Sequence, residues 1–116
     1  MNETIRLANL VVDPNTYEVR VGGRVVMLPN LQFKLLSYFA AHSNQIITSE
    51  RLIREVWGQP GAMSNEKLRV QIYRLRMAMQ TMGPWRIKTV PKRGYGLMRS
   101  KMERPRKSGR RSPSPV

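Results

Sequence analysis

The sequence predicts an α+β fold, in which a small antiparallel sheet precedes three helices and a C-terminal β-hairpin. Short stretches near both ends alternate apolar and polar residues, which is the two-residue period of half-buried strands. Between them, apolar residues recur at spacings of three and four, the period of amphipathic helices. A length of 116 residues fits one domain.

The N-terminal part of the chain carries the signals of the sheet. Asp13, Pro14 and Asn15 form a typical turn sequence. Gly22 and Gly23 favour a tight hairpin turn, because such turns need positive φ. Between and around these turns, we expect strands at residues 5–7, 10–12, 17–21 and 24–27.

The first two helices are predicted at residues 29–41 and 49–57. Pro29 suits the first turn of a helix, where no N–H bond is lost. Thr48 is positioned to cap the second helix. The residues expected to face inward are Leu28, Leu31, Leu35, Leu36 and Phe39 in the first helix and Leu52, Ile53, Val56 and Trp57 in the second.

The third helix, at residues 64–82, has one apolar stripe and one basic face. Ser64 or Asn65 can cap its start, and Gly83 with Pro84 ends it. The buried stripe is predicted to be Leu68, Ile72, Leu75, Met79 and Met82, and the outer side to be Lys67, Val70 and Arg74, with Gln71 at its margin and Arg69 and Arg76 on the flanks. Arg and Lys suit phosphates or guanine and Gln suits adenine, so this face fits a DNA groove. A solvated basic helix is the alternative interpretation.

The second and third helices form a helix-turn-helix with a lengthened turn at residues 58–63. In that arrangement the second helix of the pair enters the major groove. Residues 85–90 and 95–98 alternate as strands around a turn at 91–94. A hairpin in this place is a wing, whose basic tip could reach phosphates or a minor groove.

Charge is segregated along the chain. The net charge is +14, yet residues 1–66 have six Lys/Arg and six Asp/Glu. Residues 67–98 have eight Lys/Arg and no acid, and residues 99–116 have seven with one Glu. Segregation of this kind is typical of a polyanion-binding face. We expect residues 1–98 to be the domain and residues 99–116 to be a disordered basic tail, either a plain terminus or a source of non-specific attraction to DNA.

Several function classes are excluded by composition. The chain has no Cys and a single His, so neither a disulfide framework nor a zinc finger can form. His42 has no cluster of ligating residues around it in the sequence and is expected at the surface or at a helix end. We expect no cofactor, no metal and no enzymatic activity. No apolar run approaches the roughly 20 residues that span a membrane.

Three segments resemble the OmpR-type winged helix-turn-helix domain. They are residues 48–58 (TSERLIREVWG), 68–76 (LRVQIYRLR) and 89–95 (TVPKRGY). The resemblance covers residues 5–98, and the wing segment is most similar to the ToxR branch. It implies a four-stranded N-terminal sheet, double-stranded promoter DNA as the ligand, tandem binding on repeated half-sites, and contact with RNA polymerase by a transcription regulator, here expected to be an activator.

The resemblance also assigns roles by position. It implies base contacts at Val70, Gln71 and Arg74, and a wing tip at Lys92 and Arg93. Contacts to the DNA backbone or its flanks fall at Trp57, Lys67, Tyr73 and Arg76. From its place on the flank of the third helix, we expect Arg69 to contact a phosphate as well. The loop through which some members touch polymerase corresponds to Gly58, Gln59, Pro60, Gly61, Ala62 and Met63.

The chain departs from the family pattern in three places. Pro29 and Gln32 stand where a Thr and a Glu usually form the capping box of the first helix, so that cap must be built differently. Gly96 stands where a basic residue commonly follows the wing tyrosine. No receiver domain precedes the sheet, so we expect a cytoplasmic stand-alone regulator, or the cytoplasmic part of a membrane-tethered one if the native chain continues past residue 116. Without a coiled-coil seam, we expect a monomer in solution that pairs on DNA.

One alternative function shares the same charge pattern. A basic module without sequence reading, either RNA-associated or nucleoid-associated, would also concentrate cations on one face. RNA modules usually expose aromatic side chains for base stacking. The outer face here offers chiefly Tyr73, which favours sequence-specific binding to duplex DNA.

Overall fold

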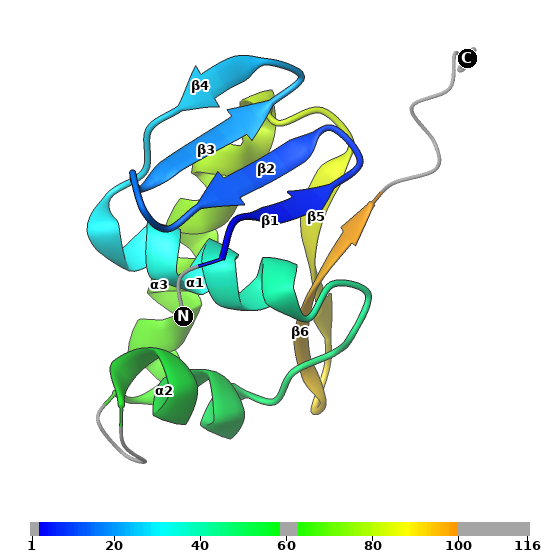
Figure 1. Cartoon of the computed structure of the whole chain (residues 1–116). Helices are drawn as coiled ribbons and strands as arrows, with labels where there is room; N and C mark the ends of the chain where they lie inside the picture. Colours follow the sequence, from blue (N-terminus) through cyan, green and yellow to red (C-terminus); the bar gives the residue numbers. More distant parts are fainter. Residues whose placement is uncertain (1–2, 59–62, 100–116) are drawn as a thin grey trace, which may run out of the picture.

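The computed structural model describes residues 3–58 and 63–99, and it has the predicted order of sheet, helices and hairpin. The strands are β1 (Ile5–Leu7), β2 (Leu10–Asp13), β3 (Glu18–Val21), β4 (Arg24–Val26), β5 (Trp85–Val90) and β6 (Gly94–Arg99), and the helices are α1 (Asn30–Ala41), α2 (Ser49–Trp57) and α3 (Asn65–Ala78). Figure 1 shows the N-terminal sheet at the top with α1 below it, α2 at the bottom and the β5–β6 hairpin at one side. The predicted α+β winged-helix fold is confirmed.

The N-terminal sheet packs one face on the helices. Its strands pair antiparallel in sequence order. Gly22 and Gly23 have φ of 58° and 86°, as the predicted tight turn requires. The predicted third and fourth strands are each one residue too long, because Tyr17 turns to a φ of 59° and Met27 lies beyond β4. The buried positions of the sheet are Leu10, Val12, Val19 and Val21.

The start of α1 differs from the prediction. Pro29 is not inside the first turn but is the N-cap residue, whose carbonyl oxygen accepts the backbone N–H of Phe33 at 2.9 Å. Proline has no side-chain acceptor, so no capping box forms, and Gln32 is buried instead of reaching back to the cap. His42 caps the other end of α1, as predicted, with Nδ1 3.0 Å from the carbonyl oxygen of Tyr38.

The caps of α2 and α3 are those predicted. Thr48 Oγ1 accepts a backbone N–H at 3.1 Å, and Ser64 Oγ accepts another at 3.2 Å. Gly58 ends α2 with a φ of 94°. The predicted third helix extends too far, because α3 ends at Ala78 and a tighter 3₁₀ turn, η1 (Met79–Thr81), completes it.

The wing is joined to the segment between α1 and α2. Ile47 and Tyr95 exchange two backbone hydrogen bonds, of 2.7 and 2.9 Å, and the N–H of Asn44 donates to the carbonyl oxygen of Leu97 at 3.0 Å. Residues 44–47 therefore lie along β6, which the sequence did not predict. This contact explains Gly96, since a Cβ there would lie 2.4 Å from the carbonyl oxygen of Gln45.

The core lies where the sheet, α1, α3 and the wing meet. The predicted stripe of α3 is fully buried: Leu68, Ile72, Leu75, Met79 and Met82. In α1, Leu35, Leu36 and Phe39 are buried as predicted, and Phe33 joins them without having been predicted. Val56 and Trp57 are half-buried and pack against the core from α2. The phase of α3 that the sequence predicts is therefore correct, and its opposite face points outward.

Candidate nucleic-acid interface

The outer face of α3 carries side chains that the core does not use. The exposed members of the predicted set are Lys67, Arg69, Val70, Tyr73 and Arg74. Two of them are apolar or aromatic, and Val70 is 46% and Tyr73 61% exposed. A face that combines cations with exposed apolar groups offers both phosphate contacts and contacts to thymine methyl groups.

Met77 is an exposed residue on this face that was not predicted. It is 46% exposed. It follows Val70 by seven residues, or two helical turns, so both lie on one side of α3. This spacing is visible in the sequence and could have identified Met77.

Arg76 is held against the wing. Its Nε donates to the carbonyl oxygen of Ile87 at 3.0 Å, and its Nη2 donates to Oγ1 of Thr89. A guanidinium has five N–H donors, so three remain for a phosphate. Arg76, predicted to contact the DNA backbone, thus also links α3 to β5.

Gln71 faces α1 with one end of its amide. Its Oε1 accepts a hydrogen bond from Nε2 of Gln32 at 2.5 Å. Gln71 is half-buried, as expected for a residue at the margin of the outer face, whereas Arg74 is exposed. The two polar residues predicted to read bases therefore differ in side-chain mobility. Gln71 is anchored to the core by a hydrogen bond, whereas Arg74 is not.

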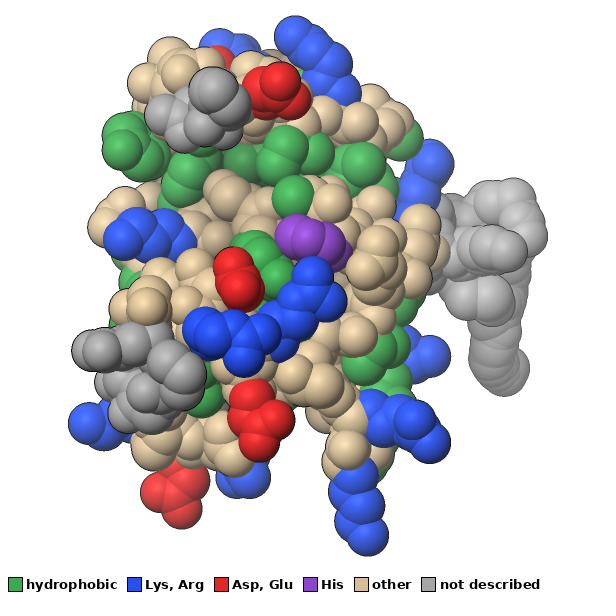
Figure 2. All heavy atoms as spheres, turned by 60° about the horizontal axis from the view of Figure 1, so that its bottom comes forward, with side chains coloured by type: hydrophobic (Ala, Val, Ile, Leu, Met, Phe, Trp, Pro, Cys, Tyr) green, Lys and Arg blue, Asp and Glu red, His purple; other side chains and the backbone are tan. Residues whose placement is uncertain are grey.

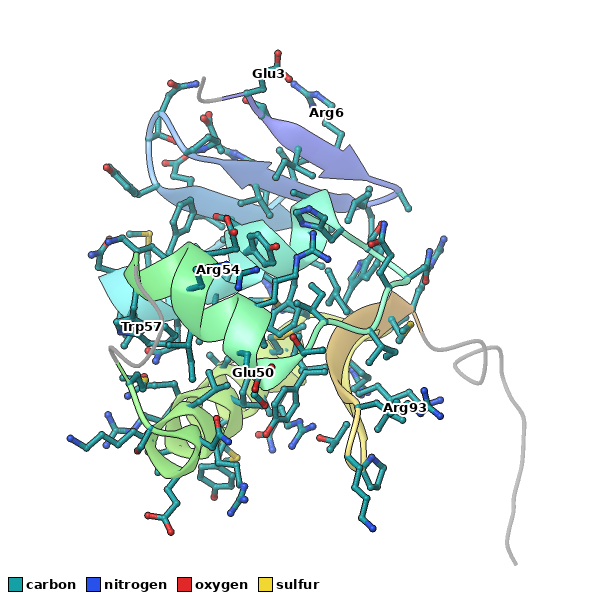
Figure 3. All side chains as sticks on the ribbon, turned by 90° about the horizontal axis from the view of Figure 1, so that it is seen from below. Glu3, Arg6, Glu50, Arg54, Trp57 and Arg93 are labelled. Atoms are coloured by element: carbon teal, nitrogen blue, oxygen red, sulfur yellow. The ribbon has the colours of Figure 1, made fainter. Side chains whose placement is uncertain are left out.

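A groove of about 480 Å³ separates the starts of α2 and α3 from the wing tip. Residues at the starts of α2 and α3 and residues of the wing line it, among them Thr48, Glu50, Asn65, Arg69, Thr89 and Arg93. Glu50 lies in the first turn of α2 on the side toward α3 (Figure 3). The groove thus has cations on its α3 and wing walls and an acidic side chain on its α2 wall.

Lys92 and Arg93 form the tip of the wing, as predicted, and both are exposed. Arg93 projects from the hairpin away from the helices (Figure 3). Lys92 has a φ of 65°, a left-handed conformation that costs a non-glycine residue on the order of 1–2 kcal/mol. The turn therefore carries a cation at a position where glycine would be less strained.

The region around Trp57 is only partly described. Trp57 is half-buried at the end of α2 (Figure 3), where it contacts the core as well as the surface. Of the predicted polymerase-contact loop, Gly58 and Met63 are described, and Met63 packs against the core. Residues Gln59, Pro60, Gly61 and Ala62 lie outside the described residues, as do residues 100–116 of the predicted tail, while Arg99 is the last residue of β6.

The cations of the candidate interface are not neutralised by ion pairs. Within residues 3–58 and 63–99, the two ion pairs are Arg20 with Glu18 and Arg54 with Glu55, on β3 and α2. Figure 2 shows Lys and Arg side chains along the lower edge of the molecule with acidic ones between them, and a hydrophobic band higher up. One cation of residues 67–98 lies away from the candidate interface. Arg86 donates to the carbonyl oxygens of Gly83 and Trp85, at the end of the hairpin opposite the wing tip.

A family model described as "Transcriptional regulatory protein, C terminal" matches residues 23–97. The chain belongs to this family. The match confirms the OmpR-type domain predicted from the three motifs. The family comprises domains of transcriptional regulators, not enzymes. Over the part of the chain that the structure describes, no helix combines the length and apolarity needed to cross a bilayer.

Two curated relatives illustrate the similarity. The chain is 31% identical over 96 residues to the phosphate regulon transcriptional regulatory protein PhoB of Klebsiella pneumoniae, and 32% identical over 95 residues to the heme response regulator HssR of Staphylococcus aureus. The alignments cover 82% and 81% of this chain but 42% of each relative. The chain thus spans about two fifths of the length of these regulators.

Solved structures agree with this family assignment. The Klebsiella pneumoniae RstA DNA-binding domain, in complex with the RstA box, superposes with a TM-score of 0.72 at 32% identity, over 83% of this chain and 97% of that domain. The DNA-binding domain of E. coli CadC gives a TM-score of 0.70 at 30% identity, over 84% of this chain and 94% of that one. The E. coli CpxR domain gives 0.69 at 28%, over 84% and 98%.

Proposed function

We propose that this chain binds double-stranded promoter DNA sequence-specifically and acts in a bacterial transcription regulator, as an activator. One observation carries the proposal. Arg76 joins α3 to β5, so the outer face of the helix and the basic wing tip form one surface with a fixed geometry. The RstA domain, solved with its own DNA box, shares this fold and supports the proposal.

Each side chain of this surface has a proposed role. α3 enters a major groove, where Arg74 and Gln71 bond to base edges and Val70 packs on a thymine methyl group or a sugar. The wing tip, through Lys92 or Arg93, reaches the adjacent minor groove or backbone. The proposed backbone contacts are Trp57, Lys67, Arg69, Tyr73 and Arg76.

Further features belong to the same proposal. Residues 1–98 act as the DNA-binding domain, and residues 99–116 are a basic tail outside it. The protein is a monomer in solution, pairs on tandem half-sites and contacts RNA polymerase through residues 58–63, in the bacterial cytoplasm. Membership of the ToxR branch rests on the wing segment 89–95 alone.

The test is selection from random-sequence duplexes at about 0.15 M salt, where weak electrostatic binding is suppressed. Enrichment of a repeated motif, with half-sites about one helical turn apart, is the expected result. Binding without enrichment, lost steeply as salt rises, would instead favour a non-specific basic module. The Arg6→Ala variant is the matched control, because Arg6 is exposed on the sheet, across the helices from α3 (Figure 3).

A further inference from the structure

Gln32 is a buried polar residue with one identified partner. It is 5% exposed and is the one polar side chain in the buried core of the described residues. A buried amide without hydrogen bonds is costly, so its environment strongly favours keeping a partner. The partner is Gln71 on α3, whose Oε1 accepts from Nε2 of Gln32 at 2.5 Å.

This bond orients the amide of Gln71. The oxygen and the nitrogen of a glutamine amide lie on opposite sides of Cδ. When the oxygen points to α1, the NH₂ group is the end farther from Gln32. A glutamine that makes two hydrogen bonds to adenine must accept one from N6 with its oxygen and donate the other to N7 with its nitrogen.

We propose that Gln32 is a positioning residue that determines base specificity through Gln71. By holding Oε1 of Gln71, it makes Gln71 present N–H donors to the DNA. The base pair read there then offers an acceptor in the major groove, such as O6 or N7 of guanine or O4 of thymine. This differs from the adenine contact expected of a free glutamine. The inference rests on the proposed function, because it requires Gln71 to meet a base.

The substitution Gln32→Glu reverses the hydrogen-bond direction. A carboxylate only accepts, so Gln71 must donate its NH₂ inward and turn its oxygen outward. Gln32 lies in the first turn of α1, where the helix dipole favours an anion over the protonated carboxyl, and the selection is run at alkaline pH so that Glu at this position stays ionised. The preferred base should then be one with a major-groove donor, adenine or cytosine.

The experiment is duplex selection with the wild type, Gln71→Ala and Gln32→Glu. Gln71→Ala locates the motif position that Gln71 reads. At that position alone, Gln32→Glu should change the preferred base, with a change in relative affinity on the order of tenfold. Gln45→Glu, a change of equal charge at an exposed loop residue, is the control and should keep the wild-type motif.

The outcomes separate the two proposals. If the wild type enriches no motif, the proposed function fails. If a motif appears but Gln71→Ala or Gln32→Glu leaves every position unchanged, the role of Gln32 is wrong while the function stands. If Gln32→Glu does not fold by thermal melting, Gln32→Met replaces it. That variant should lose the preference at the Gln71 position only, and an unchanged motif would overturn the inference.

Discussion

The guanidinium of Arg76 on α3 donates from Nε to the carbonyl oxygen of Ile87 on β5, over 3.0 Å. A second bond from the same guanidinium reaches Thr89, two residues further along the strand. The fork therefore bridges the helix proposed to enter the major groove and the strand that leads to the wing tip. Since a planar guanidinium makes such paired bonds and an ammonium does not, its shape matters as well as its charge.

The substitution Arg76→Lys tests that distinction. We expect it to reduce the free energy of binding by about 1 kcal/mol for cognate and random duplexes alike. The lysine keeps the charge but cannot make the two paired hydrogen bonds of the guanidinium. Arg76→Ala should weaken both further. Fluorescence anisotropy titrations would measure the affinities. Wild-type affinity in Arg76→Lys would mean that the charge alone is needed.

Arg74→Ala should behave differently from either Arg76 variant. Arg74 is exposed on the outer face of α3 and is proposed to bond a base edge. Its loss should cost about 1–3 kcal/mol on the selected site and relax sequence preference, with little effect on random DNA. Competition between the two duplexes measures the ratio. Equal losses on both would refute base reading by Arg74.

Leu75→Ala tests the phase of α3 through stability. Leu75 is fully buried, and removing its side chain should lower the free energy of unfolding by about 2–5 kcal/mol. Met77→Ala, an exposed change on the same helix, should stay within about 0.5 kcal/mol. Thermal or urea denaturation measures both. Similar effects for the two variants would contradict the orientation of the helix.

At Lys92, stability and binding should respond in opposite directions. Lys92→Gly relieves the left-handed backbone and should be more stable than Lys92→Ala by about 1 kcal/mol. Both lose the cation and should bind DNA more weakly, with a smaller salt dependence. Denaturation and salt titrations would compare them. If the Lys92→Gly variant bound DNA with wild-type affinity, Lys92 would not be a DNA contact.

Local sequence signals predicted the elements and the buried faces. The period of α3 identified Leu75 and its neighbours as core, and side-chain chemistry identified Thr48 and Ser64 as caps. The errors are local as well. Pro29 is the N-cap residue of α1 and not part of its first turn, and the last turn of the third helix tightened into a 3₁₀ turn.

The links between elements could not be predicted from periodicity. Gln32 and Gln71 are 39 residues apart, and nothing in either helix alone indicates that they meet. The same holds for Arg76, whose position on the flank of the helix suggested a phosphate contact but whose bonds run to the wing. Only the packing of α1, α3 and β5 brings these groups together, while the DNA contacts themselves remain predictions.

The backbone pairing of Ile47 with Tyr95 has a thermodynamic consequence. It ties the residue just before the cap of α2 to the residue just after the wing turn. The wing is thus ordered when the domain folds, and little of its conformational entropy remains to be lost on DNA. Preorganisation of this kind lowers the cost of association without adding a contact. The amide protons of Ile47 and Tyr95 should accordingly exchange slowly in the absence of DNA.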